Sequence, residues 1–419
     1  MSSHQITLLF IDLGLILFLA RALGHLAARV NQPAVVGEIV AGILLGPTLF
    51  NGAISDLLFP ADIRPLLTGM ADVGVALFMF TVGMELDRAT LRGRSRVTGG
   101  AVTGSTVVPF LLGIGLAFYL MRTHEVTSTA AFVVFIGLSV SVTAFPVLAR
   151  ILTERALSRT TIGGIALATA ASVDVVAWTA LAAVQASVGG GGDHWRVALA
   201  VPYVLVTLLV VRPLLRRVFV RNGEAVPFAP WHLALVLIGV LLSAAATEAM
   251  GMHFIFGAFL FGTVMPREKT LLVRSEIEDR MGQVTSLLLP VYFVVAGLKV
   301  DLGSMKASDF AELGLIMLVA VIGKFGGTYA GARTQGLPPR PSAALGVLMN
   351  TRGLTELVIL GVGLQLGLLD ADLYSLMVVM AVVTTAMTGP LLSRIYRKPV
   401  EVPDPEGTAE PERVTSSAG

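Results

Sequence analysis

The sequence predicts an all-α membrane protein of about 13 transmembrane helices, arranged as two inverted repeats that each contain one interrupted helix. Hydrophobic residues make up 55% of the 419-residue chain and charged residues only 14%, against roughly 25% in soluble domains. Thirteen apolar stretches are long enough to cross a bilayer core of roughly 30 Å. Short motifs also recur seven spans apart, and this odd offset reverses the orientation of the second copy.

The predicted spans follow the chain with short connections. They cover residues 6–27, 34–50, 66–86, 97–121, 129–152, 160–188, 196–219, 231–250, 252–266, 279–300, 310–333, 341–367 and 372–397. The first span is expected to be retained, because it lacks the basic flank and small-residue cleavage site of a signal peptide. Residues 1–400 are expected to form one transmembrane domain, and the Pro- and Glu-rich residues 401–419 a disordered cytoplasmic tail.

Basic residues predict the orientation, since cytoplasmic connections are rich in Lys and Arg. With the N-terminus outside and the C-terminus in the cytoplasm, 23 of the 30 basic residues fall on the inner side. Leaving out the short ninth span would move Arg267, Lys269, Arg274 and Arg280 outside, so the charge pattern supports that span. The expected location is the plasma (inner) membrane, which the chain crosses many times.

Two pairs of motifs carry the internal repeat. Segment 82–87 (VGMELD) at the end of span 3 is echoed by segment 296–301 (AGLKVD) at the end of span 10. Two glycines and a proline of span 2 recur at similar spacing in span 9, as Gly37, Gly42 and Pro47 against Gly257, Gly262 and Pro266. Six spans, a linking span 7 and six further spans therefore predict two halves of opposite orientation.

One carboxylate lies deep within a predicted span. Asp174 comes fifteen residues after Arg159, so at about 1.5 Å per residue it should lie near the middle of the membrane. A lone acid at this depth usually lines a water-filled path or pairs with a partner. Asp174 is therefore interpreted as a site that binds either a proton or a cation; the alternative is a protonated side chain that only supports helix packing.

Span 5 contains an interruption centred on a proline. Pro146 cannot donate a hydrogen bond to Val142 and disfavours helix at Phe145, which predicts a break. Freed carbonyls and the hydroxyls of Ser141 and Thr143 are then candidate oxygen ligands for a dehydrated alkali cation. The alternative is an ordinary proline kink.

Span 12 has a polar interruption between apolar halves, which includes Asn350, Thr351, Arg352 and Glu356. Arg352 and Glu356 are four residues apart, so they can neutralise each other. Interrupted helices at corresponding positions of two halves, here spans 5 and 12, indicate the binding site of a transporter.

Lys324 lies in span 11 among glycines that allow close helix packing. It is a candidate to titrate or to act as a fixed counter-charge to Asp174, and the alternative is a side chain that snorkels to the inner face. The other polar residues in or near the spans are interpreted as structural or as span ends: Glu38, Asp72, Glu85, Glu248 and His253. No cofactor is expected and no metal beyond an alkali cation.

The residues above resemble those of the monovalent cation:proton antiporters of the Kef and plant cation/proton exchanger type, which contain a Na⁺/H⁺ exchanger domain. The matching segments are 38–47, 141–152, 174–178, 251–259, 323–327, 350–357 and 387–390. These segments occur in order over nearly the whole chain, so their combination is specific although each one is short.

The resemblance implies the sodium/proton antiporter fold and a homodimer. Spans 1–3 and 8–10 would form the dimerisation part, span 7 the linker, and spans 4–6 and 11–13 the transport core, with spans 5 and 12 as crossed broken helices. Asp174 matches the family's ion- and proton-binding carboxylate, Thr143 the adjacent hydroxyl and Lys324 the core lysine. Val173 stands where many relatives have a second polar residue. Electroneutral exchange is therefore expected if Lys324 keeps its charge, and electrogenic exchange if it titrates.

The predicted function is secondary active antiport of Na⁺ or K⁺ against H⁺ by alternating access, rather than an enzymatic reaction. One alternative is a gated cation efflux channel of the Kef type. Others are an intramembrane aspartyl protease, which needs two facing carboxylates, and a receptor, which needs a ligand-binding or signalling domain. The expected partners are the two ions, the lipid bilayer and a second copy of the chain, with no nucleic acid and no regulatory nucleotide-binding domain in this chain.

Overall fold

The computed structural model describes most of the chain. The described residues are 3–30, 32–49, 52–60, 62–85, 95–155, 157, 160–188, 199–221, 224–250, 252–266, 270–303 and 305–396. The predicted tail, 401–419, therefore lies outside the described residues. Apart from one hairpin of two short strands, the regular structure in the described part of the chain is helical. This confirms the predicted fold class.

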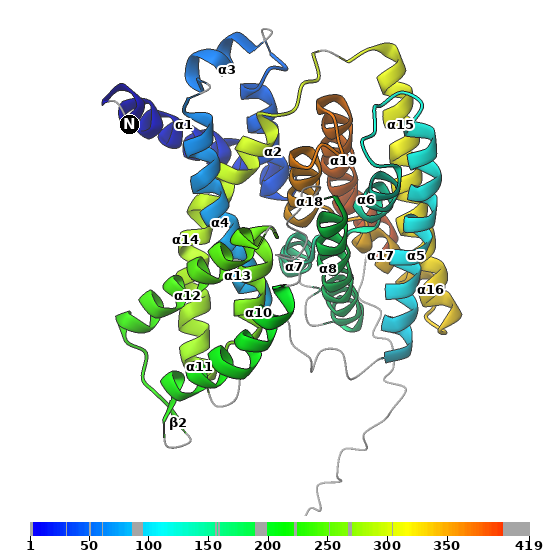
Figure 1. Ribbon diagram of the computed structural model, residues 1–419. Coiled ribbons are helices and arrows are strands. Elements are labelled where there is room, and N and C mark those ends of the chain that lie inside the picture. The colour runs from blue at the N-terminus through cyan, green and yellow to red at the C-terminus, as the bar shows by residue number, and fades with distance from the viewer. Residues whose placement is uncertain are drawn as a thin grey trace, which may run out of the picture.

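The helices separate into two units that stand side by side (Figure 1). The first unit contains α1 (Ser3–Arg29), α2 (Ala34–Leu45), α3 (Ala53–Leu58), α4 (Arg64–Glu85), α12 (Pro230–Ala249), α13 (Phe254–Thr263) and α14 (Leu271–Gly297). Within it, α4 packs between α13 and α14, while α2 contacts α1 and α14. Its helices coincide with predicted spans 1–3 and 8–10, apart from the short α3.

The second unit contains both interrupted spans. It consists of α5 (Ser95–Leu120), α6 (Thr129–Ser141), α7 (Phe145–Glu154), α8 (Thr161–Val188), α15 (Ala307–Val321), the π-helical turn η3 (Ile322–Gly326), α16 (Gly327–Thr334), α17 (Pro339–Met349), α18 (Leu354–Gln365) and α19 (Ala371–Ile395). α5 packs against α6, α8 and α16, and α19 against α15, α17 and α18. The unit coincides with predicted spans 4–6 and 11–13.

Span 7 connects the halves as α10 (Ala200–Val206), the π-helical turn η2 (Thr207–Val211) and α11 (Arg212–Phe219), which leads into the antiparallel hairpin β1 (Val220–Arg221) and β2 (Glu224–Ala225). Seven described helices are long and apolar enough to cross a membrane by themselves, and α17 with α18, bent by 42° at a break, form an eighth candidate. Each of the thirteen predicted spans coincides with helix. Their number of membrane crossings stays a prediction, since α2, α6 and α13 are short apolar helices.

Close glycine contacts follow the predicted repeat. A Cβ on Gly42 of α2 would lie 2.2 Å from the Val294 carbonyl oxygen and 2.8 Å from the Gly297 Cα, both on α14. A Cβ on Gly262 of α13 would lie 2.2 Å from the Phe80 carbonyl oxygen and 3.0 Å from the Gly83 Cα, both on α4. The motif alignment pairs Gly42 with Gly262 and Gly297 with Gly83, so the two repeats form the same helix contact twice.

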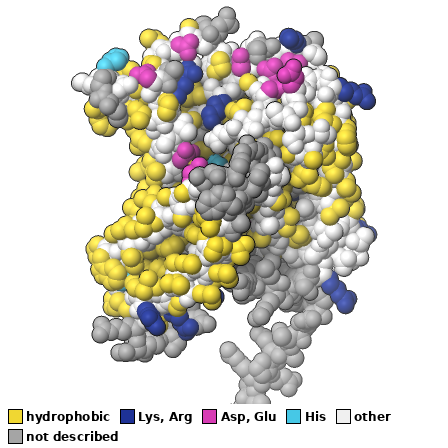
Figure 2. Space-filling model, in the orientation of Figure 1, with side chains coloured by type: hydrophobic (Ala, Val, Ile, Leu, Met, Phe, Trp, Pro, Cys, Tyr) yellow, Lys and Arg dark blue, Asp and Glu magenta, His cyan; other side chains and the backbone are white. Residues whose placement is uncertain are grey.

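Two ends of the molecule serve as landmarks. At the α3 end, the upper end of Figure 1, Arg64 at the start of α4 pairs with Asp56 of α3 at 2.9 Å. At the hairpin end, the lower end of Figure 1, Arg274 of α14 donates to the carbonyl of Met84 at the end of α4. Hydrophobic side chains cover much of the flanks of both units, whereas Lys and Arg gather toward the two ends (Figure 2). This surface suits a lipid environment, and the sequence predicts the α3 end as the outer one.

Candidate ion-binding site

The first interruption divides span 5 into two short helices. α6 ends at Ser141, Val142 is extended with φ −73° and ψ 150°, and α7 begins at Phe145. Pro146 is thus the second residue of α7, where a missing N–H leaves no helical hydrogen bond unmade. The break predicted from this proline is confirmed.

The second interruption lies between α17 and α18. α17 ends at Met349 and α18 begins at Leu354. The hydroxyl of Thr385, on α19, accepts a hydrogen bond from the Arg352 N–H at 2.9 Å and donates to the Arg352 carbonyl at 2.8 Å. A side chain from a neighbouring helix therefore satisfies backbone groups that the break exposes. Sequence reasoning missed Thr385, because one hydroxyl within an apolar helix gives no signal of its own.

The two interruptions touch each other. The Thr143 hydroxyl donates to the Met349 carbonyl at 3.0 Å, and the Ala144 N–H donates to the Thr351 carbonyl at 3.0 Å. Each break thereby supplies hydrogen-bond partners to the other. Spans 5 and 12 are about 200 residues apart in the sequence, and these hydrogen bonds hold them together. Both are broken helices of the same unit, as predicted.

Two buried cations bind the carboxyl end of α6. Arg352 donates to the carbonyls of Ser139 at 2.8 Å and Val140 at 2.6 Å. The Lys324 amine, on η3, donates to the Ser141 carbonyl and, at 2.9 Å, to the carbonyl of Ser105 on α5. The last carbonyls of a helix form the negative end of its dipole, and the two cations neutralise this partial charge. In this conformation, side chains therefore occupy the carbonyls of Ser139, Val140 and Ser141.

Arg352 also forms the ion pair predicted from its spacing. Its guanidinium lies 2.6 Å from the Glu356 carboxylate, and both side chains are fully buried. Lys324 is fully buried as well, so it does not snorkel to a surface. Breaking such a buried pair costs several kcal/mol, because the remaining charge loses its partner.

Asp174 lies at the middle of α8, in the second unit. Its side chain is 3% exposed, and neither carboxylate oxygen has a side-chain hydrogen-bond partner among the described residues, while the backbone N–H of Phe145 is directed at the carboxylate. It faces a narrow cavity of about 10 Å³, close to the volume of one water. The other residues that line this cavity are Val82, Phe145, Ala171, Val175 and Phe259.

The environment of Asp174 suits a small cation or a proton. Phe145 begins α7, and the N–H groups of a first helical turn form the positive end of the helix dipole. Val82 and Phe259 belong to α4 and α13 of the first unit, so the carboxylate faces the boundary between the two units. A buried carboxylate that has no charged or side-chain partner is unstable as an anion unless it takes up a counter-ion or a proton.

The remaining predicted residues are buried around the two breaks. The Ser141 hydroxyl donates to the Leu138 carbonyl at 2.9 Å, within its own helix. The Asn350 Oδ1 and the Thr351 hydroxyl have no hydrogen-bond partner among the described residues. Of the predicted site residues, Phe145 shares the Asp174 cavity, whereas Ser141 and Thr143 do not line it. Sequence reasoning also missed Ser105, since a backbone carbonyl leaves no signal in the sequence.

Comparison with known proteins decides the family. Residues 14–398 match the model of the transmembrane domain of sodium/hydrogen exchangers. The chain belongs to this family. It is 36% identical over 411 residues to the Na(+)/H(+) antiporter NhaS4 of Synechocystis sp., covering 95% of the chain and 100% of that protein. The family predicted from the sequence motifs is therefore confirmed.

Other relatives are longer than this chain. It is 38% identical over 411 residues to cation/H(+) antiporter 20 of Arabidopsis thaliana, covering 93% of the chain and 48% of that protein. It is 34% identical over 418 residues to K(+)/H(+) antiporter 1 of Saccharomyces cerevisiae, covering 94% and 47%. The chain thus spans about half the length of these two relatives. The names of these relatives do not favour the gated channel.

A solved structure shares the fold. The sodium proton antiporter MjNhaP1 from Methanocaldococcus jannaschii superimposes with a TM-score of 0.68 over 93% of this chain and 96% of that one, at 14% sequence identity. At that identity the likeness concerns the fold, and it supports the predicted antiporter architecture.

Proposed function

We propose that the chain is a secondary antiporter that exchanges Na⁺ or K⁺ for H⁺, and that Asp174 binds the cation and the proton in turn. The observation that carries the proposal is a buried carboxylate that has no side-chain partner among the described residues and lies at the boundary between the two units. The relatives named above as cation/H(+) and Na(+)/H(+) antiporters support the choice of ions.

The proposed cycle is competition at one site. A proton on Asp174 neutralises the carboxylate in one state, and a dehydrated alkali cation neutralises it in the other. The second unit, which carries Asp174 on α8 and both broken helices, moves as the transport core against the first unit to expose the site to each side in turn. The first unit forms the homodimer interface in this proposal.

Lys324 and Arg352 keep the break in place during the cycle. Both donate to carbonyls at the end of α6 and so neutralise that helix end. The positive amino end of α7 then remains as the helix end that faces Asp174. If Lys324 keeps its proton, one H⁺ exchanges for one cation, and the exchange is electroneutral. An imposed membrane voltage should then leave the exchange rate unchanged.

A vesicle assay with a matched pair of variants tests the proposal. Asp174→Asn should abolish the dequenching of a pH-sensitive dye when Na⁺, K⁺ or Li⁺ is added to proteoliposomes. Asp12→Asn alters a buried aspartate of α1 that has no hydrogen-bond partner among the described residues, and it should keep the exchange. Unchanged exchange in the Asp174 variant would remove this residue from the mechanism, and cation flux that ignores the pH gradient would contradict antiport.

A further inference from the structure

Besides the Asp174 cavity, two further cavities lined by described residues lie between the units, one toward each end of the molecule, and they differ in size. The cavity toward the hairpin end has a volume of about 370 Å³ and is lined by Arg21, Thr81 and Glu278 of the first unit and by Val147 and Leu354 of the second, among others. The cavity toward the α3 end has a volume of only about 30 Å³. The units are therefore apart at one end and close together at the other.

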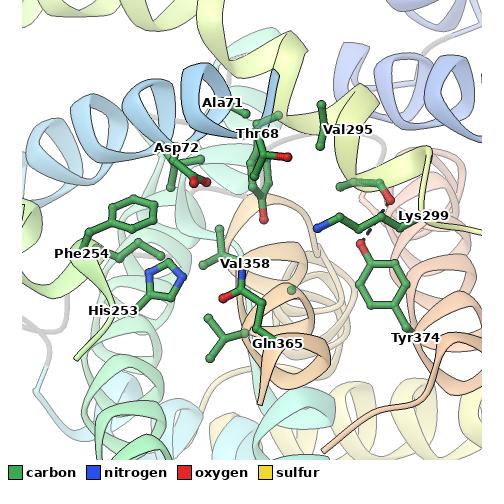
Figure 3. Close-up of a pocket in the computed structure, with 16 residues that line it drawn as sticks. Thr68, Ala71, Asp72, His253, Phe254, Val295, Lys299, Val358, Gln365 and Tyr374 are labelled. Carbon is green, nitrogen blue, oxygen red and sulfur yellow. Dashed lines mark hydrogen bonds between the residues drawn. The ribbon is translucent and has the colours of Figure 1, made fainter. Parts of the chain in front are cut away.

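Several polar and charged side chains line the small cavity among apolar ones, and both units build it (Figure 3). Asp72 of α4, His253 before α13 and Lys299 after α14 line it from the first unit, and Gln365 and Tyr374 line it from the second. The side chains of Asp72, Lys299 and Gln365 extend toward a common space from three sides (Figure 3). An acid and a base that face the same narrow space are unusual for packing between two apolar helix bundles.

Hydrogen bonds between described residues join the units around this cavity. The Tyr374 hydroxyl donates to the Ala296 carbonyl at 3.1 Å, and the Asp301 N–H donates to the Ser375 hydroxyl at 3.1 Å. The His253 N–H donates to the side-chain oxygen of Gln185 on α8, also at 3.1 Å. Each bond would have to break if the second unit moved away from the first at this end.

The small cavity lies a short way from the Asp174 site. Val75 lines the small cavity and Val82 the Asp174 cavity, seven residues apart on α4, which is roughly 10 Å of helix. On α13 the corresponding residues are Ile255 and Phe259, about one helical turn apart. A separation of the units at the α3 end would thus connect the small cavity to Asp174.

We propose that the small cavity is the closed second entrance to the Asp174 site, and that Asp72 is the residue that attracts the cation into it. This inference rests on the proposed function. Asp72 lies two turns into α4, and Lys299, two residues after the end of α14, also lines the cavity. Once the entrance opens, the carboxylate raises the local cation concentration and the ammonium group lowers it.

The test measures the apparent KM for the transported cation separately at each face of oriented proteoliposomes. Asp72→Asn should raise this KM at the α3-end face by roughly 3- to 10-fold, and Lys299→Gln should lower it by roughly 2- to 3-fold. Both variants should leave the KM at the hairpin-end face unchanged. Opposite, one-sided shifts cannot come from general destabilisation. Asp62→Asn, which removes an exposed acid at the same end but outside the cavity, is the control and should change neither value.

A second measurement uses the absence of cysteine from the chain. A single Gln365→Cys variant should react with a membrane-impermeant, charged thiol reagent added at the α3-end face during turnover, and should not react from the other face. Reaction only from the hairpin-end face, or unchanged KM values in both charge variants while Asp174→Asn still abolishes exchange, would overturn the inference and leave the proposed function standing. Loss of cation-dependent proton flux in the unaltered protein would instead overturn the proposed function.

Discussion

A histidine at the α3 end of the second unit gives a quantitative prediction. His124 follows α5, and its Nδ1 lies 2.6 Å from an Asp370 carboxylate oxygen while its Nε2 lies 3.1 Å from a Glu312 carboxylate oxygen. Both ring nitrogens can donate only when the imidazole is protonated. The hydrogen bond to Asp370, together with the one to Glu312, raises the pKa of His124 from 6.5 to about 9 against the opposing effect of burial.

The size of the effect follows from the two pKa values. A rise from 6.5 to about 9 corresponds to roughly 3 kcal/mol of folding free energy by linkage. The Asp370 side chain is 43% exposed, so solvent screening reduces the contribution to roughly 1–2 kcal/mol. Because the folded-state pKa is the higher one, this stabilisation is complete below pH 6.5 and is lost as the pH rises through about 9.

Thermal unfolding in detergent between pH 6 and pH 10 checks this prediction. His124→Gln should unfold at a lower temperature than the unaltered protein near pH 6, by an amount equivalent to roughly 1–2 kcal/mol, and the two curves should meet near pH 10. His25→Gln, which alters an exposed histidine of α1, is the control and should follow the unaltered protein. A gap between the His124 variant and the unaltered protein that is constant over this pH range would refute the argument.

Three further variants test packing, the break and the closed end. Gly83→Ala puts a Cβ 2.2 Å from the Phe259 carbonyl oxygen and should lower the unfolding temperature by the equivalent of about 1–3 kcal/mol. Gly69→Ala, on the same helix but with open space around the new Cβ, is the control and should not lower it. Arg352→Gln should destabilise the protein by about 3–5 kcal/mol, because it leaves Glu356 buried and unpaired. An Arg352→Met/Glu356→Leu double variant that unfolds no later than the single variant would contradict this. Tyr374→Phe removes the hydrogen bond to Ala296 and should raise α3-end labelling of Gln365→Cys by about 2- to 10-fold; unaltered labelling would show that this bond does not hold the end closed.

The sequence predicts the helices and the breaks because their signals are local. Apolar length identifies the spans, and Pro146 marks the start of α7 with no knowledge of tertiary structure. The Arg352 and Glu356 pair follows from helical spacing alone. The repeat is also visible, because close helix contacts require glycine at the same places in both halves, as at Gly42 and Gly262.

The partners of the buried groups could not be predicted, because they lie far apart in the sequence. Lys324 donates to a backbone carbonyl 219 residues away, at Ser105, and a carbonyl is present at every position of a chain. Arg352 reaches the end of α6 in the same way, 213 residues away at Ser139. The sequence indicates only structural roles for Asp72 and His253. Nothing local reveals that Asp72 shares a cavity with Lys299, or that the His253 N–H donates to Gln185 of the other unit.

These long-range partners make the two half-helices unequal around Asp174. At a broken helix, the carboxyl end of one half and the amino end of the other offer opposite partial charges. Arg352 and Lys324 occupy the carbonyls at the end of α6, whereas Phe145, at the start of α7, lines the cavity of the carboxylate. Without these two side chains, the carbonyls at the end of α6 would themselves attract a cation. In the proposed cycle, with these carbonyls occupied, most of the attraction for an alkali ion would come from the Asp174 carboxylate, which a proton can also neutralise. Such a site would favour strict competition between the two ions.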